Sequence, residues 1–163
     1  MLRRTWWVAA AAAVALTGCA TLFSQPKNIV QTAADNPNFK TLTKLINDAG
    51  LAETLSGPGP FTVFAPTDAA FARVPAAQLD AIAKDKERLR QVLTYHVVPG
   101  KVMAAEVKNG NVKTVSGADL PLSRSGTFVG VDQALVTQAD IQATNGVIHV
   151  IDQVVIPPAP ARR

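Results

Sequence analysis

The chain has 163 residues, of which 48% are hydrophobic, 17% are charged and one is a cysteine. A single cysteine cannot form an internal disulfide, which excludes a disulfide-stapled scaffold. The net charge of +4 comes from basic and acidic residues that are scattered along the chain, without a basic helix face or interleaved aromatic residues. This distribution does not predict nucleic-acid binding.

The first residues have the pattern of an export signal. A short basic segment at residues 1–4 precedes an uninterrupted apolar run from Trp6 to Leu16, as in secretory signal peptides. The run has 11 residues, well short of the roughly 20 that an α-helix needs to cross the hydrocarbon core of a bilayer. We therefore expect export and no transmembrane span in the mature protein.

The next segment, Leu16-Thr17-Gly18-Cys19, resembles the bacterial lipobox. The resemblance implies that residues 1–18 are a lipoprotein signal peptide, that diacylglycerol is attached to Cys19, and that the new amino terminus is acylated. Ordinary signal cleavage that leaves a free thiol is the alternative. Two or three acyl chains would hold the protein stably at a membrane, whereas one chain alone binds only marginally. Ala20, where Asp would retain a lipoprotein at the inner membrane, fits sorting to an outer membrane.

Removal of the signal leaves 145 residues with a net charge of +2, from 14 basic and 12 acidic residues. This length predicts one domain that can bury a core without disulfides. We expect residues 19–27 to form the lipidated terminus and a tether, residues 28–157 the domain, and residues 158–163 a disordered tail.

The first half of the mature chain is predicted to be largely helical. Asn28 is a good N-cap for a first helix, which the sequence NPNF at residues 36–39 interrupts. Gly50 is placed as the left-handed C-cap of a second helix, and a further helix spans about residues 76–94 with a candidate break near residues 84–86. The apolar residues of the second helix recur at helical spacing: Leu42, Leu45, Ile46 and Ala49.

A strand, a tight corner and a capped helix are predicted near residue 65. Residues 61–65 form a short β-prone run that Pro66 ends. Thr67 or Asp68 can then accept a hydrogen bond from the first free N–H groups of the next helix, and a carboxylate also suits the positive end of its dipole.

From Lys108 onward, short β-prone pieces alternate with turn sequences. The last piece, VIHVIDQVVI, is predicted to be a strand that starts at Asn145-Gly146 and ends at Pro157-Pro158. Helices in the first half and strands in the second predict an α+β fold rather than an alternating βαβ design.

Catalytic and metal-binding patterns are not found. The chain lacks the G-x-S-x-G, H-E-x-x-H, C-x-x-C and P-loop sequences, although an enzyme assembled from distant residues has no such signature. His149 and Asp152 are three residues apart, so in a strand they face opposite sides and cannot chelate one ion. We predict no enzyme activity, no cofactor and no metal, and we expect His96 and His149 to have structural roles as half-buried, hydrogen-bonded and neutral side chains.

Three segments together resemble the fasciclin domain family. They are FTVFAPTDAAFARVP at 61–75, LRQVLTYHVVPGKV at 89–102 and ATNGVIHVIDQVVIPP at 143–158. The resemblance, which covers essentially all of residues 28–157, implies a compact wedge or sandwich of about seven strands packed with several helices. It also implies adhesion to a protein or polysaccharide surface without catalysis, at the bacterial cell envelope, on the outer membrane or facing the periplasm. A small-ligand-binding or stress-protective envelope lipoprotein is the alternative.

The resemblance also implies interaction residues. The family's tyrosine-histidine motif falls on Tyr95 and His96, and the Asp-Ile pair of its integrin-binding members falls on Asp140 and Ile141. The competing interpretation makes Asp140-Ile141 a strand edge that enters the next turn, and makes His96 part of a packed junction with the Thr67-Asp68 corner. Structural roles are expected for four further polar residues: Thr67, Asp68, His149 and Asp152.

Overall fold

The computed structural model describes residues 27–157, so the predicted signal peptide, Cys19, most of the tether and the tail at 158–163 lie outside it. Helices fill much of the first half: α1 (Ile29–Asp35), η1 (Pro37–Phe39), α2 (Lys40–Asp48), α3 (Ala52–Ser56), α4 (Asp68–Arg73), α5 (Ala76–Lys84) and α6 (Lys86–Tyr95). The strands are β1 (Phe61–Pro66), β2 (Val97–Pro99), β3 (Gly110–Lys113), β4 (Asp119–Ser125), β5 (Phe128–Val131), β6 (Ala134–Ala143) and β7 (Gly146–Ile151). No helix within residues 27–157 combines the length and apolar character that a membrane crossing requires.

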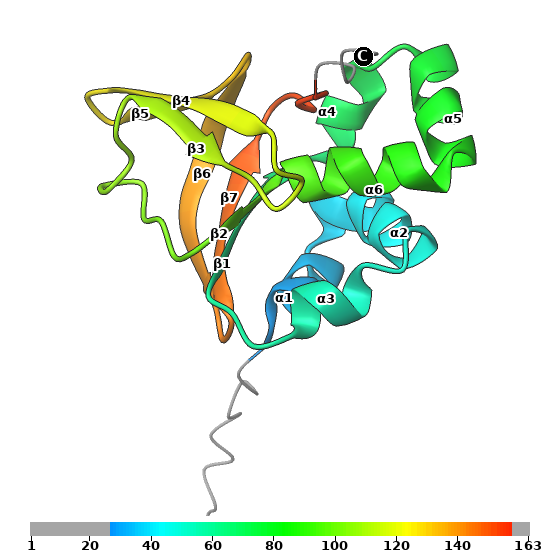
Figure 1. The fold of residues 1–163 in the computed structure, drawn as a ribbon, viewed down its shortest axis with the longest axis horizontal. Coiled ribbons are helices and arrows are strands. Elements are labelled where there is room, and N and C mark those ends of the chain that lie inside the picture. Colours follow the sequence, from blue (N-terminus) through cyan, green and yellow to red (C-terminus); the bar gives the residue numbers. More distant parts are fainter. Residues whose placement is uncertain (1–26, 158–163) are drawn as a thin grey trace, which may run out of the picture.

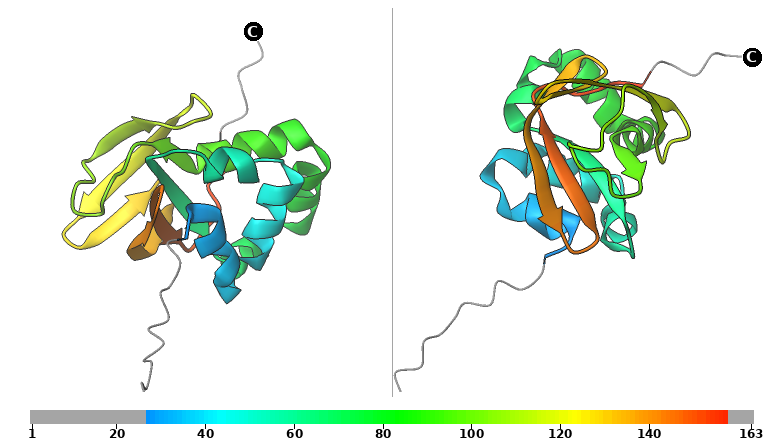
Figure 2. Two further views of the ribbon diagram at one scale, coloured as in Figure 1. Left: turned by 90° about the horizontal axis from the view of Figure 1, so that it is seen from below. Right: turned by 90° about the vertical axis from the view of Figure 1, so that its left-hand side faces the viewer.

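The strands form one curved sheet in the order β2-β1-β7-β6-β5-β4-β3, with the helices gathered beside it (Figures 1 and 2). Neighbours are antiparallel except β1 and β7, which run parallel from the pair Phe61 and Gly146 to the pair Pro66 and Ile151. The two edge strands, β2 and β3, come close to each other. The N–H of Val115, just after β3, donates to the carbonyl oxygen of Val97 in β2 at 2.8 Å. The α+β prediction and the expected number of strands are confirmed.

Strands β1 and β7 separate two hydrophobic cores. Nearly every residue of both strands is buried, as expected for parallel neighbours that are covered on both faces. Val63 and Ile148 face the core under the helices, whereas Phe64 and Ile151 face the core enclosed by the curved sheet. The helices therefore cover one face of β1 and β7, and strands β3 to β5 curl over the other face.

Local sequence signals account for several helix ends. The Asn28 side chain accepts from the Gln31 N–H at 2.8 Å in a capping box. The Thr67 hydroxyl caps α4 by accepting from the Ala70 N–H at 3.2 Å. Gly50 adopts the predicted left-handed conformation with φ of 68°, and the long helix predicted over 76–94 does break, at Asp85 between α5 and α6.

Asp68 has a different partner from the one its position suggested. Its carboxylate accepts from the Thr41 N–H at 2.9 Å, in the first turn of α2 rather than in the helix that Asp68 itself begins. The N-terminus of α2 has no cap from its own preceding residue. A residue 27 positions later in the chain therefore caps it, and this bond ties α4 to α2.

The structure adds one helix to the sequence prediction and shortens one strand. Residues 52–56 form the added helix, α3, which is too short for its apolar residues to show a helical period. Strand β7 ends at Ile151, and the prediction that it continues to Pro157 is wrong. The Asp152 carboxylate accepts from the Leu135 N–H at 2.8 Å and the Asp152 N–H donates to the Leu135 carbonyl at 3.1 Å, so Asp152 is still bonded to β6. The chain bends at residues 152–153 and leaves the sheet after this contact.

Asn145 and Gly146 join the start of β7 to three other elements. The Asn145 side chain accepts from the Ile29 N–H at 2.9 Å and donates to the carbonyls of Leu55 and Gly57 at 2.7 and 3.0 Å. At Gly146, a Cβ atom would lie 1.9 Å from the Phe61 carbonyl oxygen. The pair therefore does more than form the predicted turn, because it fixes α1, α3 and β1 at one end of the sheet.

Candidate interaction surface

Asp140 lies at an irregular point of β6. Its φ is 58°, in the left-handed region that non-glycine residues seldom adopt, and the pairing of β6 with β7 shifts register on both sides of Gln138. Bulges of this kind re-aim a side chain out of the regular strand alternation. The Asp140 side chain is exposed, and its Oδ1 accepts from the Ala104 N–H at 2.9 Å.

Ile141 is only partly available to a partner. It pairs with Ile148 of β7, and its half-buried side chain packs against the core beneath the helices. The predicted pair therefore consists of an exposed carboxylate beside a side chain that mainly serves the fold. The carried-over interaction role of Asp140-Ile141 stays a prediction.

His149 is buried within β7, with 1% of its surface exposed. Its Nε2–H donates to the Val102 carbonyl oxygen at 2.8 Å, and its Nδ1 accepts from the Asp140 N–H at 3.3 Å. The ring stacks on Phe64 with 5.5 Å between centroids. With one nitrogen donating and the other accepting, the ring is in its neutral Nε2–H form.

Residues 100–107, which we call the 100–107 loop, connect β2 toward β3 and lie against this site. Thr62, which is fully buried, donates from its hydroxyl to the Gly100 carbonyl at 2.7 Å and accepts from the Val102 N–H at 2.8 Å. The Arg124 guanidinium donates to the Ala105 carbonyl. Side chains from the sheet thus hold the loop at several points.

Tyr95 is the last residue of α6 and points into the core inside the sheet, with 2% of its surface exposed. Its hydroxyl donates to the Asp119 carbonyl oxygen at 3.1 Å. Burial raises the pKa of this hydroxyl, and the nearby carboxylates of Asp132 and Asp119 add to the rise. Tyr95 therefore keeps its proton at neutral pH and links α6 to the start of β4.

His96 follows directly and is also buried. Its Nδ1–H donates to the Val92 carbonyl at 2.7 Å, and its Nε2 accepts from the Val155 N–H at 3.1 Å. Its ring does not bond the Thr67-Asp68 corner, which was the predicted junction. Burial lowers the pKa of His96 to about 4. A partner could not touch Tyr95 or His96 in this conformation, so the interaction role carried over to them stays a prediction and would have to be indirect.

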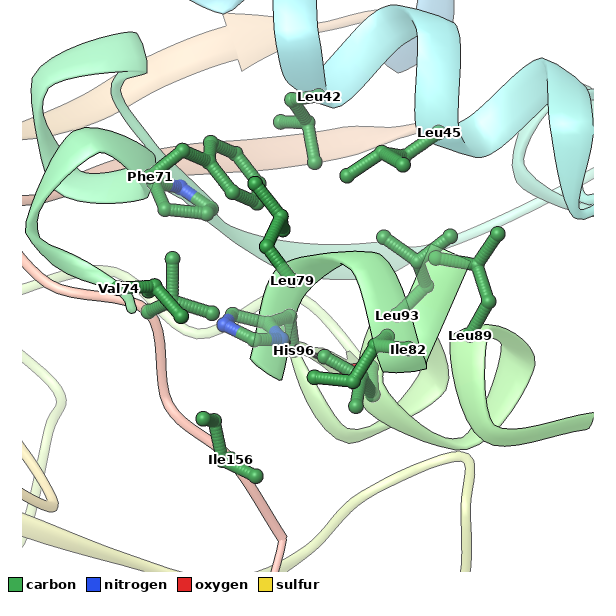
Figure 3. Close-up of a pocket in the computed structure, with 13 residues that line it drawn as sticks. Leu42, Leu45, Phe71, Val74, Leu79, Ile82, Leu89, Leu93, His96 and Ile156 are labelled. Atoms are coloured by element: carbon green, nitrogen blue, oxygen red, sulfur yellow. Dashed lines mark hydrogen bonds between the residues drawn. The ribbon is translucent and has the colours of Figure 1, made fainter. Parts of the chain in front are cut away.

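A small apolar cavity lies beside His96, between α2, α4, α5, α6 and the segment after β7 (Figure 3). Leu42 and Leu45 line one side and Ile156 another. Its volume is about 20 Å³, roughly enough for one or two water molecules. Both nitrogens of His96 are used by main-chain groups, so the cavity offers no convergent polar groups for a small ligand.

Asp152 contacts both β6 and α4. Besides its two bonds to Leu135, its Oδ2 lies 3.5 Å from the Arg73 guanidinium. This places the end of β7 next to the end of α4. Within residues 27–157, no three His, Cys, Asp or Glu side chains are grouped so that they could hold a metal ion.

Two residues that organise this region were missed as sites by sequence reasoning, namely Thr62 and Asn145. Thr62 lies in an apolar strand, where threonine is common for its branched shape alone. Asn145 stands before glycine, where it reads as a turn residue. A buried hydroxyl and a turn amide both need hydrogen-bond partners, but those partners are 38 to 116 positions away in the chain.

These features define a small α+β domain with one curved, nearly closed seven-stranded sheet and one parallel pair, β1 and β7. The chain belongs to the fasciclin domain family, whose sequence pattern matches residues 37–157. It is 48% identical to Protein sll1483 of Synechocystis over 132 residues, which are 80% of this chain and 73% of that protein. It is 37% identical to the cell surface glycolipoprotein MPB83 of Mycobacterium bovis over 149 residues, which are 88% of this chain and 67% of that protein.

The fold is also similar to a solved FAS1 domain pair from the insect cell adhesion molecule fasciclin I. The TM-score is 0.59 at 21% sequence identity, and the match covers 74% of this chain and 46% of the solved chain. At this identity the likeness concerns the fold.

Proposed function

We propose that the protein is a lipid-anchored envelope protein that binds other surface molecules through its fasciclin domain and does not catalyse a reaction. The family and the name of MPB83, a cell surface glycolipoprotein, support a surface role. The observation that carries the proposal is Asp140, an exposed carboxylate at a left-handed bulge that hydrogen bonds hold in place. Residues in rare backbone conformations persist where the surroundings fix them, and they cluster at functional sites.

The proposed anchor is Cys19, with residues 1–18 as the signal peptide and 19–27 as the tether. The domain begins beside the turn between β6 and β7, because the Thr144 N–H donates to the Lys27 carbonyl at 3.0 Å. A short tether from Cys19 would therefore hold this end of the sheet toward the membrane. An outer membrane, or a membrane facing the periplasm, is the proposed location.

The non-catalytic part of the proposal is supported by the two histidines. All four ring nitrogens bond main-chain groups, at Val92 and Val155 for His96 and at Val102 and Asp140 for His149. Neither ring is directed at a nucleophilic side chain, as general-base catalysis would need.

The proposal is tested by Asp140→Asn, which removes the charge while Asn still tolerates the left-handed conformation. The matched control is Asp132→Asn, because Asp132 is also exposed and has a φ of 54°. Cells that display the full chain are tested for attachment to surfaces coated with envelope polysaccharide or envelope protein from the host bacterium. We expect at least tenfold weaker attachment for Asp140→Asn and wild-type attachment for Asp132→Asn. Equal attachment of both variants to every coat would reject Asp140 as an interaction residue.

A further inference from the structure

Asp140 and the 100–107 loop meet at one buried side chain. The ring of His149 accepts from the Asp140 N–H on one side and donates to the Val102 carbonyl on the other, at 3.3 and 2.8 Å. The Asp140 carboxylate in turn accepts from the Ala104 N–H at 2.9 Å. These three bonds form a closed hydrogen-bond network between β7, β6 and the loop.

Strand β1 also supports this hydrogen-bond network. Thr62 in β1 fixes both Gly100 and Val102 through its hydroxyl, and Phe64, two residues later in the same strand, stacks on the His149 ring. The imidazole therefore has little freedom to turn. Its two nitrogens define where the Asp140 main chain and the Val102 main chain can lie.

The bulge at Asp140 needs such support. A left-handed conformation costs a non-glycine residue roughly 1–2 kcal/mol, and this cost must be offset by contacts that a regular strand would not make. The bond from the Asp140 N–H to His149 and the bond from the Asp140 carboxylate to Ala104 are contacts of that kind. Without the imidazole nitrogen, one of the two is lost.

We propose that His149 is a positioning residue, which holds Asp140 and the 100–107 loop in a fixed relation and so keeps the exposed Asp140 carboxylate in one orientation. The use of Asp140 for binding rests on the proposed function, whereas the positioning does not. The loop itself has the exposed residues Lys101, Ala105 and Glu106.

The positioning is tested by amide hydrogen exchange in His149→Phe, which keeps a ring of similar size and removes both nitrogens. The matched control is His96→Phe, because His96 is the other buried histidine and bonds Val92 and Val155 instead. Relative to the amides of α2, we expect the Asp140 and Ala104 amides to exchange at least tenfold faster in His149→Phe. In His96→Phe these two amides should keep their relative protection, and the Val155 amide should lose its own.

A uniform change of exchange over the whole chain in His149→Phe would overturn the proposal, since it would show only a loss of global stability. If that variant does not fold, the ¹⁵N spectrum of the wild-type imidazole decides. We expect the neutral Nε2–H tautomer with an unprotonated Nδ1. The Nδ1–H tautomer would overturn the proposal, because it could not accept from Asp140.

Cell attachment then separates the two proposals. Loss of attachment in both His149→Phe and Asp140→Asn, with faster local exchange in the former, supports both. Faster local exchange with full attachment in both variants leaves the positioning intact and rejects the interaction role. Loss of attachment in Asp140→Asn with unchanged exchange in His149→Phe rejects the positioning.

Discussion

The Val155 N–H donates to His96 Nε2 at 3.1 Å, which joins the segment after β7 to the end of α6 across 59 positions of the chain. Val155 and its neighbours leave the sheet after Ile151 and run past the helices. Because the imidazole must be unprotonated at Nε2 to accept this bond, the contact depends on pH.

The first prediction is that stability falls as the medium becomes acidic, in part through His96. The folded-state pKa of about 4 lies below the ordinary histidine value of 6.5, so the unfolded chain binds the proton more readily. The contribution is complete above pH 6.5 and is lost as the pH falls toward 4, at about 1.4 kcal/mol per unit or roughly 3 kcal/mol in total. Urea unfolding between pH 7.5 and 5 should show a shallower decline for His96→Phe than for the wild type. Parallel declines would contradict the assignment to His96.

Gly146→Ala should prevent stable folding or lower the free energy of unfolding by at least about 3 kcal/mol, since the clash is with main chain that cannot move aside. The new Cβ would lie 1.9 Å from the Phe61 carbonyl oxygen and 2.8 Å from its carbon. Gly126→Ala is the control: its φ is 61° but a Cβ there meets nothing within 4 Å. We expect the control to lose only about 1–2 kcal/mol, the cost of the left-handed conformation alone. Similar losses in thermal or urea unfolding of the two variants would show that the clash with Phe61 is not the cause of the lost stability.

Asn145→Ala should cost about 2–4 kcal/mol, because it leaves the Ile29 N–H and the carbonyls of Leu55 and Gly57 without their partner. Asn111→Ala, at an exposed position of the edge strand β3, should change stability by less than about 0.5 kcal/mol. Urea unfolding of both variants checks this. A loss below 1 kcal/mol for Asn145→Ala would mean that water replaces these bonds without cost.

Asp68→Ala should loosen the start of α2, although Asp68 lies in α4. Loss of a helix cap costs about 0.5–2 kcal/mol, and here the freed donor is the Thr41 N–H. The measurement is amide exchange, which should accelerate at Thr41 more than at Ala70, whose N–H bonds Thr67. If Ala70 responds instead, Asp68 caps its own helix in solution.

Features that depend on residues close together in the sequence were predictable, and features that depend on distant residues were not. The Asn28 cap, the C-cap at Gly50 and the Thr67 cap of α4 depend on residues a few positions away, so sequence patterns could indicate them. Fold class and family were likewise recoverable, because apolar spacing and the order of three sequence segments carry them. The contact of Asp152 with Leu135 was not, because the two residues are 17 positions apart in the chain.

For the candidate site, the sequence indicated which residues take part but not how they are connected. Sequence reasoning selected Asp140 and His149 separately and expected His149 to be half-buried and hydrogen-bonded, whereas the structure buries it almost completely. It could not show that the two bond each other, because the register of β6 against β7 is irregular between them. Exposure was harder still, since no local pattern distinguishes the buried Tyr95 from a surface tyrosine.

Attachment of lipid at Cys19 is a separate prediction. Wild-type cells fed a labelled fatty acid should incorporate label into the protein, and the protein should fractionate with membranes because multiple acyl chains bind a bilayer stably. Cys19→Ala should lose both properties. A Cys19→Ala protein that still fractionates with membranes, together with an unlabelled wild type, would reject the anchor.

Site-specific photo-crosslinking on intact cells tests the central claim most directly. A photoreactive residue at Gln142, exposed and two positions from Asp140, is compared with one at Lys84, exposed at the end of α5. If Asp140 is the interaction residue, the Gln142 probe should capture a distinct envelope macromolecule in the wild type, and far less of it in Asp140→Asn, while the Lys84 probe captures none. Capture of the same macromolecule at equal yield from both positions, or no dependence on Asp140, would contradict it.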